Sequence, residues 1–356
     1  MKFLSTRFRS ALLLPLFALA AGCSDSTTGP SDNEIDAAPV LLDVGSKVIL
    51  ATYVDLDDKA AALNTAVTAF NANPTEENLN AAKQAWRNAR RPWEQSEAFL
   101  FGPVDTKGID PAIDDWPLNR IDLDAVLASD AVLTKEYVDG LETSQKGFHT
   151  IEYLLFGEGN TKTAAQSTPR EREYLIAATQ SFKGETAKLR QSWDPAGENY
   201  LAEFTGAGAT STVYPSATVA LQEVVKGMIG ICDEVASGKI SGPFTEQDRT
   251  QEESQFSDNS NTDFQDNIRS VQNVYRGYYT GTSGRGIGLI VSTLNPSLDV
   301  RVRQEIDAAI TAIGAMTPSF GRAITDNKPS VEAAIAAITK LKETLERDVL
   351  PLMKEE

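Results

Sequence analysis

The chain has 356 residues, and its 50 Asp and Glu residues outnumber 33 Lys and Arg residues, which gives a formal net charge of −17. An acidic chain lacks the basic face that nucleic-acid phosphates require, so we expect no binding to nucleic acid. The same charge is suited to attracting cations. The length is more than a single helical core usually fills, so two domains are expected.

The first 22 residues carry the features of a secretory signal peptide. Basic residues come first, an apolar run over 11–19 follows, and small residues precede Cys23. The apolar run is shorter than the roughly 20 residues that a membrane-spanning helix needs. The small residues before Cys23 resemble a lipobox, so we expect residues 1–22 to be removed and Cys23 to carry a lipid anchor. Ordinary secretion, with cleavage near Ala21, is the alternative.

The segment after Cys23 is polar and predicts an exposed tether. Residues 24–34 contain no apolar residue to bury, which is typical of disorder, and we expect the tether to cover 23–39. Ser24 does not resemble a signal for retention at the inner membrane. The sequence therefore favours a cell-envelope lipoprotein that is anchored at the outer membrane and faces the periplasm or the cell surface.

Beyond the tether, the pattern of apolar residues is helical. They recur at helical spacing over 302–313 and again over 331–345. The stretch Thr168-Pro169-Arg170-Glu171 has the capping residues of a helix start. Alternating β patterns are almost absent, so the expected fold is all-α and built from helical bundles.

The small residues of 205–212 mark the expected domain boundary. Their glycines and small side chains are typical of a flexible segment, and they lie near the middle of the mature chain. We therefore expect an N-terminal helical bundle over 40–208 and a C-terminal helical bundle over 209–356. With Cys23 used by the anchor, Cys232 has no partner for an intrachain disulfide, and its apolar neighbours predict a buried thiol.

The single histidine of the chain, His149, lies in the stretch Gly147-Phe148-His149-Thr150-Ile151-Glu152. On a helix, His149 and Glu152 are three residues apart, so the imidazole and the carboxylate emerge on one face and can reach one ion. Gly147 leaves room beside them for a ligand or a neighbouring helix. Taken alone, the same pair is also compatible with a satisfied His–Glu contact in the core.

A second cluster places charged residues on one predicted helical stripe. Arg90, Glu94 and Glu97 are spaced at i, i+4 and i+7. Two buried glutamates need a positive partner, which is either Arg90 or a cation. A solvated face with an Arg–Glu pair is the alternative. An acidic loop over 110–115, braced by prolines, follows this cluster and ends at Trp116.

Taken together, these motifs resemble the imelysin family, also called the M75 peptidase family. The resemblance rests on the Gly-x-His-x-x-Glu stretch and on Trp93-Glu94-x-x-Glu97-Ala98-Phe99, and it extends to Phe101-Gly102-Pro103, Trp116-Pro117 and Phe256-Ser257-Asp258-Asn259. It covers most of the mature chain. It implies two helical bundles with a site between them, in periplasmic or lipid-anchored proteins that are linked to iron acquisition.

The resemblance also implies a set of metal ligands. His149 and Glu152 correspond to the signature pair, and Glu94 and Glu97 correspond to acidic ligands of related iron-uptake proteins. An aspartate from the loop is expected to join them, and we choose Asp114 over its neighbours Asp110 and Asp115. The residues expected to line the site are Gly147, Arg90, Trp93, Asp115 and Ser257.

The donor types favour metal binding over catalysis. One imidazole and several carboxylates suit harder cations, so we expect iron, with zinc or calcium as other candidates. A single histidine excludes the two- or three-histidine sites that zinc hydrolases usually have. We therefore predict a metal-binding protein. The family resemblance implies a role in iron acquisition, with an iron-transport partner in the envelope as a candidate. The alternatives are a metal-dependent peptidase of the imelysin type and a polysaccharide- or protein-binding module that uses the tryptophans Trp86, Trp93 and Trp116.

Overall fold

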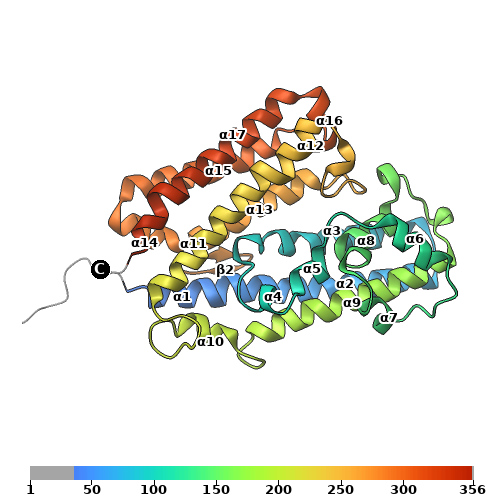
Figure 1. Ribbon diagram of the computed structural model, residues 1–356, viewed down its shortest axis with the longest axis horizontal. Coiled ribbons are helices and arrows are strands. Elements are labelled where there is room, and N and C mark those ends of the chain that lie inside the picture. The colour runs from blue at the N-terminus through green and yellow to red at the C-terminus, as the bar shows by residue number, and fades with distance from the viewer. Residues whose placement is uncertain (1–35, 355–356) are drawn as a thin grey trace, which may run out of the picture. The chain divides into compact units, whose positions relative to one another are not determined.

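Helices make up most of the computed structural model, which describes residues 36–354 (Figure 1). The predicted signal peptide, the anchor at Cys23 and most of the predicted tether lie outside the described residues. In the first half the helices are α1 (Ala38–Asp43), α2 (Leu50–Ala72), α3 (Glu76–Glu94), α4 (Pro103–Thr106), α5 (Ile109–Asp114), α6 (Arg120–Ala128), α7 (Lys135–Asp139), α8 (Gly147–Phe156), α9 (Pro169–Trp193) and α10 (Tyr200–Thr205). In the second half they are α11 (Ala217–Asp233), α12 (Ser241–Glu246), α13 (Ser260–Arg276), α14 (Ile287–Leu294), α15 (Pro296–Gly314), α16 (Phe320–Asp326) and α17 (Lys328–Thr344).

Shorter elements connect these helices. The π-helices are η1 (Val44–Ile49), η6 (Glu234–Ile240) and η8 (Leu345–Val349). The 3₁₀-helices are η2 (Glu97–Phe99), η3 (Thr143–Gln145), η4 (Glu158–Asn160), η5 (Ala164–Gln166), η7 (Arg249–Gln251) and η9 (Leu350–Leu352). Among residues 36–354, the strands are β1 (Tyr278–Tyr279) and β2 (Thr282–Ser283), which pair as one short antiparallel hairpin. The predicted all-α fold is confirmed.

The first half is built on α2, which packs against both α3 and α9, while α8 packs against α3 and α9. The starts of these helices follow from local chemistry. The Thr75 hydroxyl accepts from the backbone N–H of Asn78 at the start of α3. At the start of α9, Thr168 and Glu171 form the reciprocal capping box that the sequence predicts.

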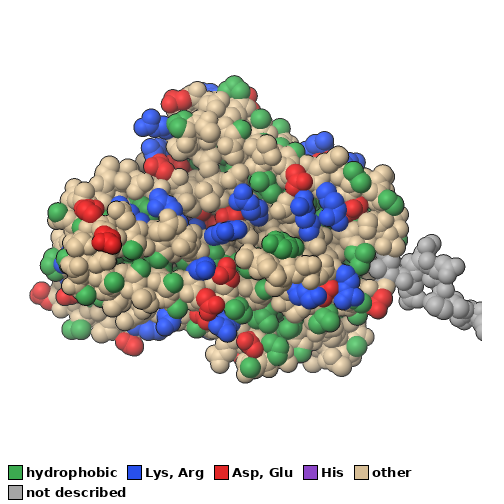
Figure 2. Space-filling model, turned by 180° about the vertical axis from the view of Figure 1, so that it is seen from behind, with side chains coloured by type: hydrophobic (Ala, Val, Ile, Leu, Met, Phe, Trp, Pro, Cys, Tyr) green, Lys and Arg blue, Asp and Glu red, His purple; other side chains and the backbone are tan. Residues whose placement is uncertain are grey.

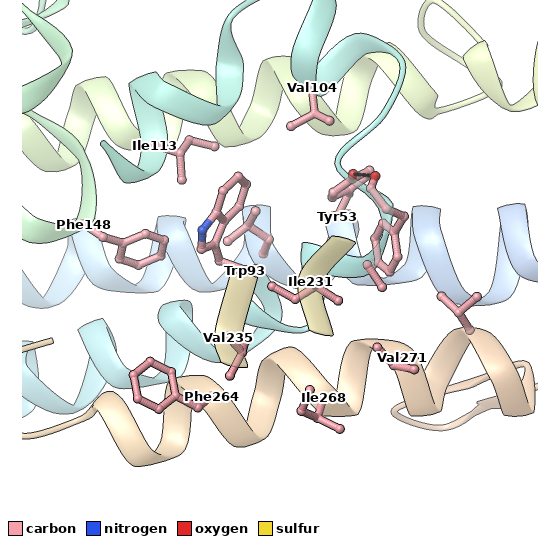
Figure 3. Packing of buried hydrophobic residues seen from close by; sticks show 14 of the residues in the cluster. Tyr53, Trp93, Val104, Ile113, Phe148, Ile231, Val235, Phe264, Ile268 and Val271 are labelled. Atoms are coloured by element: carbon pink, nitrogen blue, oxygen red, sulfur yellow. Dashed lines mark hydrogen bonds between the residues drawn. The ribbon is translucent and has the colours of Figure 1, made fainter. Parts of the chain in front are cut away.

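The second half packs α15 against α13 and α17, and α11 against α17. The predicted apolar stripe of 302–313 is the buried face of α15. Figure 3 shows Trp93 and Phe148 from the first half and Val235 and Ile268 from the second among the residues of one buried apolar cluster. The buried apolar core is therefore continuous along the described chain, and the boundary between bundles at 208/209 stays a prediction.

Hydrogen bonds and helix formation order two segments that the sequence predicts to be flexible. In the small-residue stretch 205–212, the Glu203 carboxylate accepts from the Thr212 backbone N–H at 2.6 Å and from the Ser211 hydroxyl at 2.9 Å. The first helix begins at Ala38, so the last two residues of the predicted tether are helical.

Cys232 is a buried free thiol, as predicted. None of the helices within residues 36–354 has the length and apolar character to cross a bilayer.

Candidate metal centre

The acidic cluster near Glu94 forms at the end of α3, not along one continuous helix. The helix passes Pro92 and ends at Glu94, and Glu97 lies in the separate 3₁₀-helix η2. The predicted helical stripe is therefore wrong beyond Glu94, because Gln95 leaves the helical conformation and the Ser96 N–H donates to the Trp93 carbonyl in a tight turn. Both side chains nevertheless remain buried, and one oxygen from each of Glu94, Glu97 and Asp114 lies within 4.8 Å of the others.

The predicted acidic loop over 110–115 is mostly helix, because residues 109–114 form α5. Asp114 is its last residue. One of its carboxylate oxygens accepts from the Trp93 indole N–H at 2.6 Å, and the other lies 3.1 Å from His149 Nε2 and pairs with Arg90. Asp115 instead accepts from the Thr143 hydroxyl. Of the three candidate aspartates, Asp114 is the one in contact with His149.

Gly147 allows α8 to approach α5. Its φ is +76°, and a Cβ built there would lie 2.3 Å from the carbonyl oxygen of Ile113. A side chain at this position would meet backbone, which cannot swing aside. The room beside His149 is therefore taken by a neighbouring helix, which is one of the two options that the sequence leaves open.

His149 lies between two carboxylates and is 1% exposed. Its Nε2 faces Asp114, and its Nδ1 lies 3.4 Å from Glu152 Oε2. The other oxygen of Glu152 accepts from the backbone N–H and the hydroxyl of Ser257, at 2.8 and 2.7 Å. Burial alone would lower the pKa of His149, but Asp114 and Glu152 raise it to about 9.

Glu152 therefore sits behind the imidazole rather than beside the other carboxylates. A carboxylate on the far nitrogen of a metal-binding histidine fixes the tautomer and the ring orientation. Ser257 holds Glu152 in place from the second half of the chain. The sequence places Glu152 among the ligands, whereas in the structure it contacts His149 Nδ1 and Ser257 and is not among the groups whose ligand atoms converge.

Arg90 is the positive centre of the cluster and is fully buried. Its guanidinium lies 2.6 Å from Glu94 Oε1 and 2.9 Å from Glu253 Oε1, and it also pairs with Asp114. Its Nε lies 3.6 Å from Asp263 Oδ1. Burial would lower the pKa of Arg90, but these carboxylates keep it well above its usual value. Arg90 is thus one of the two positive partners that the sequence allows for the glutamates.

Three residues of the cluster do not appear among the sequence-predicted site residues. Glu253 places an oxygen within 4.8 Å of ligand atoms of Asp114 and His149. Lys239 Nζ lies 2.9 Å from Glu253 Oε1. Asp263 is buried beside Arg90 and has its pKa raised to about 7 by burial. Glu253 lies three residues before the Phe256-Ser257 motif, which is the nearest signal in the sequence, whereas Lys239 has no local signal.

Several buried ligand atoms in this cluster have no hydrogen-bond partner. They are Glu94 Oε1, Glu253 Oε2 and His149 Nε2. Glu94 Oε1 and His149 Nε2 lie within ion-pair distance of Arg90 and Asp114, but not in hydrogen-bond alignment. Burial raises the pKa of both Glu94 and Glu97 well above the usual value. Buried polar atoms are normally paired, so Glu253 Oε2, which has neither a hydrogen bond nor an ion pair within residues 36–354, is free to accept from a ligand.

Comparison with known proteins shows the family to which the chain belongs. The model of the imelysin family, Peptidase_M75, matches residues 49–347. The chain belongs to the imelysin family. Iron-regulated protein A of Synechococcus elongatus is 33% identical over 313 residues, which cover 86% of this chain and 84% of that relative. The family resemblance seen in the sequence is confirmed.

Solved structures of imelysin-like proteins share the fold. A crystal structure from Parabacteroides distasonis, assigned as an iron-regulated protein A precursor, has a TM-score of 0.81 and 27% identity, and the match covers 92% of this chain and 97% of that one. An imelysin-like protein from Psychrobacter arcticum has a TM-score of 0.73 and 12% identity, with coverage of 90% and 97%. The second similarity shows the fold alone.

In this imelysin chain, a cavity of about 510 Å³ adjoins the cluster. Lys239 is its basic lining residue, and Trp116, which is 40% exposed, also lines it. Six carboxylate residues line it: Glu97, Asp110, Asp114, Asp115, Glu234 and Glu253. On the face of the molecule in Figure 2, by contrast, Lys and Arg side chains lie among the Asp and Glu side chains. The cavity is therefore suited to a cation and unsuited to an anion.

Proposed function

We propose that this imelysin-family protein binds a metal cation through Asp114, His149 and Glu253, with Glu94 and Glu97 beside them. The observation that supports this most directly is the set of buried ligand atoms that make no aligned hydrogen bond and lie next to an acidic cavity. A carboxylate–imidazole donor set is suited to such an ion. Glu152 would orient His149 instead of binding the ion itself.

The charge balance of the cluster favours a cation. Among the described residues, the positive charges of the cluster come from three side chains, Arg90, Lys239 and protonated His149. Five carboxylates gather around them: Glu94, Glu97, Asp114, Glu253 and Asp263. Without a further positive charge, burial and mutual repulsion keep protons on Glu94 and Glu97, as their raised pKa values indicate. A metal ion would replace those protons and remove the repulsion.

Iron is the ion that we infer, in an iron-related role. A curated relative that is 33% identical is named iron-regulated protein A, and oxygen ligands with one imidazole are compatible with iron. Zinc and calcium are the other candidates. The anchor at Cys23, the outer-membrane location and an envelope iron-transport partner complete the proposal, and they rest on the sequence alone.

The family also carries a peptidase name, but this donor set favours binding. Both nitrogens of the single imidazole, His149, face carboxylates, Asp114 and Glu152, so neither nitrogen is free to act as a base. A metallopeptidase needs an ion with an open position for water and a base beside it. Cleavage of an unfolded protein substrate that is stopped by chelator and abolished in Glu152→Gln would support the peptidase alternative.

Calorimetric titration with Fe²⁺ under anaerobic conditions tests the proposed site. Asp114→Asn and Glu253→Gln remove charge and keep shape, so each should weaken binding by at least about 100-fold. In the parent, unfolding free energy should rise by about 2.7 kcal/mol at a hundredfold excess of free ion over Kd. Glu198→Gln, at an exposed acid outside the cluster, is the control. Parental affinity in both site variants would place the ion elsewhere.

Binding should also release protons. His149 carries a proton at pH 7 in the metal-free protein because its pKa is raised to about 9, and Nε2 can coordinate an ion only when that proton has left. Apparent affinity should therefore rise with pH, by up to about tenfold per unit from this group, and fall as the solution is acidified. Calorimetry in buffers with different ionisation enthalpies gives the number of protons released on metal binding. The His149→Gln variant should release about one proton fewer than the parent. An unchanged count in that variant would remove His149 from the ligand set.

A further inference from the structure

Lys239 places a positive charge at the edge of the proposed metal site, although it is far from Arg90, Asp114 and His149 in the sequence. Its Nζ lies 2.9 Å from Glu253 Oε1 and 3.5 Å from Glu234 Oε1. The side chain lines the cavity and is 13% exposed. The two nearest carboxylates differ in their exposure to solvent: Glu253 is buried in the cluster, whereas Glu234 is 55% exposed. Lys239 is therefore positioned between the cluster and the solvent.

The local helix geometry creates this position. Lys239 and Glu234 are five residues apart on the π-helix η6. Side chains at this spacing do not face each other on an α-helix, where neighbours are three or four residues apart. The wider turn of a π-helix brings them together, and single π turns inside helices are frequent at functional sites. The π-helix thus brings Glu234 to 3.5 Å from the ammonium group, which also lies 2.9 Å from Glu253 of another segment.

Glu253 shows why Lys239, and not Arg90, is the cation that can leave. A single oxygen of Glu253 accepts from both Arg90 and Lys239, while its other oxygen is unpartnered. Arg90 is fully buried and held by four carboxylates. Lys239 contacts only Glu253 and Glu234 within ion-pair distance among the described residues, and the cavity beside it gives the side chain room to move.

We propose that Lys239 is a built-in competitor for the metal: its ammonium group holds Glu253 until a multivalent cation binds, and it then moves to Glu234. This inference rests on the proposed function, since it names the regulation of the same site. An ammonium that is held by a buried carboxylate can be displaced by a divalent or trivalent ion but not readily by Na⁺ or K⁺, because the displacing ion must supply more charge to the same oxygens. Lys239 would therefore select multivalent cations and keep the metal-free cluster neutralised.

The unaltered protein provides the first test. Lys239 should react faster with an amine-reactive ester when Fe²⁺ is bound, because its ammonium has moved toward the exposed Glu234. Lys188, which is 45% exposed beside Glu185 and outside the cluster, is the internal reference in the same mass spectrum. A several-fold rise in labelling at Lys239 and an unchanged rate at Lys188 are expected. Equal labelling of Lys239 with and without the ion would overturn the proposal.

Variants provide the second test, again by titration with Fe²⁺. Lys239→Met keeps the length of the side chain and removes its charge, so it should bind the ion at least about tenfold more tightly than the parent. Lys239→Arg keeps the charge and should bind like the parent or more weakly. Glu234→Gln should weaken binding in the parent background, and much less so when combined with Lys239→Met, because no ammonium then needs a new partner.

The outcomes separate this inference from the proposed function. Binding by the parent with unchanged affinity in Lys239→Met would overturn the competitor role alone. Weaker binding in Lys239→Met would show that the ammonium assists the ion, which also overturns it. Absence of binding in the parent and in every variant would overturn the proposed function, and this inference with it.

Discussion

Replacing Arg90 with methionine is expected to lower the unfolding free energy of the metal-free protein by about 3–5 kcal/mol. Arg90 is fully buried and pairs with Glu94, Asp114 and Glu253 at the end of α3. Its removal leaves buried carboxylates without their shared partner, which costs far more than the loss of one exposed ion pair. Urea unfolding followed by circular dichroism measures the change.

The same variant should respond unusually strongly to metal. If a cation binds among these carboxylates, it can replace part of the charge that Arg90 supplied, so Fe²⁺ should stabilise Arg90→Met by more than it stabilises the parent. Arg87→Met is the matched control one turn earlier on α3, since Arg87 donates to the Ser257 carbonyl at 3.0 Å and forms no ion pair with a carboxylate of the cluster within the described residues. Equal losses in the two variants would mean that Arg90 acts only by packing and ordinary hydrogen bonding.

Local features of the sequence predict much of the fold. The capping residues Thr168 and Glu171 specify the start of α9 through contacts within one helical turn. Apolar spacing predicts the buried face of α15 in the same way. The pairing of His149 with Glu152 also follows from helical spacing, because both side chains lie on α8. These predictions succeed because each depends on residues that are neighbours in the chain.

The site is harder to predict because its parts come from distant segments. Glu253 and Arg90 are 163 residues apart in the sequence, and no local pattern records that they form an ion pair. The role of Glu152 depends on Ser257, which reaches it from the second half. The end of α3 at Glu94 and the helical form of 109–114 also depend on packing around Trp93 and Asp114. A sequence pattern can predict the types of residue that bind a ligand, but tertiary contacts determine which of their atoms lie close together.

Replacing Gly147 with alanine is expected to destabilise the protein by about 2–4 kcal/mol and to weaken metal binding. Alanine at a φ of +76° costs about 1–2 kcal/mol by itself. The added methyl group would also lie 2.3 Å from the Ile113 carbonyl, so α8 must move away from α5. Asp114 follows Ile113 on α5 and His149 lies on α8, so this movement would separate the two ligands.

Gly159→Ala is the matched control, because Gly159 also has a positive φ, of +63°, but a Cβ there meets nothing within 4 Å. It should show the backbone cost alone and leave Fe²⁺ affinity unchanged. The difference between the two variants in urea unfolding measures the cost of separating the helices, and the difference in calorimetric affinity measures how closely that separation controls the contact between Asp114 and His149. If Gly147→Ala matches Gly159→Ala in both measurements, the approach of α8 to α5 does not position the ligands.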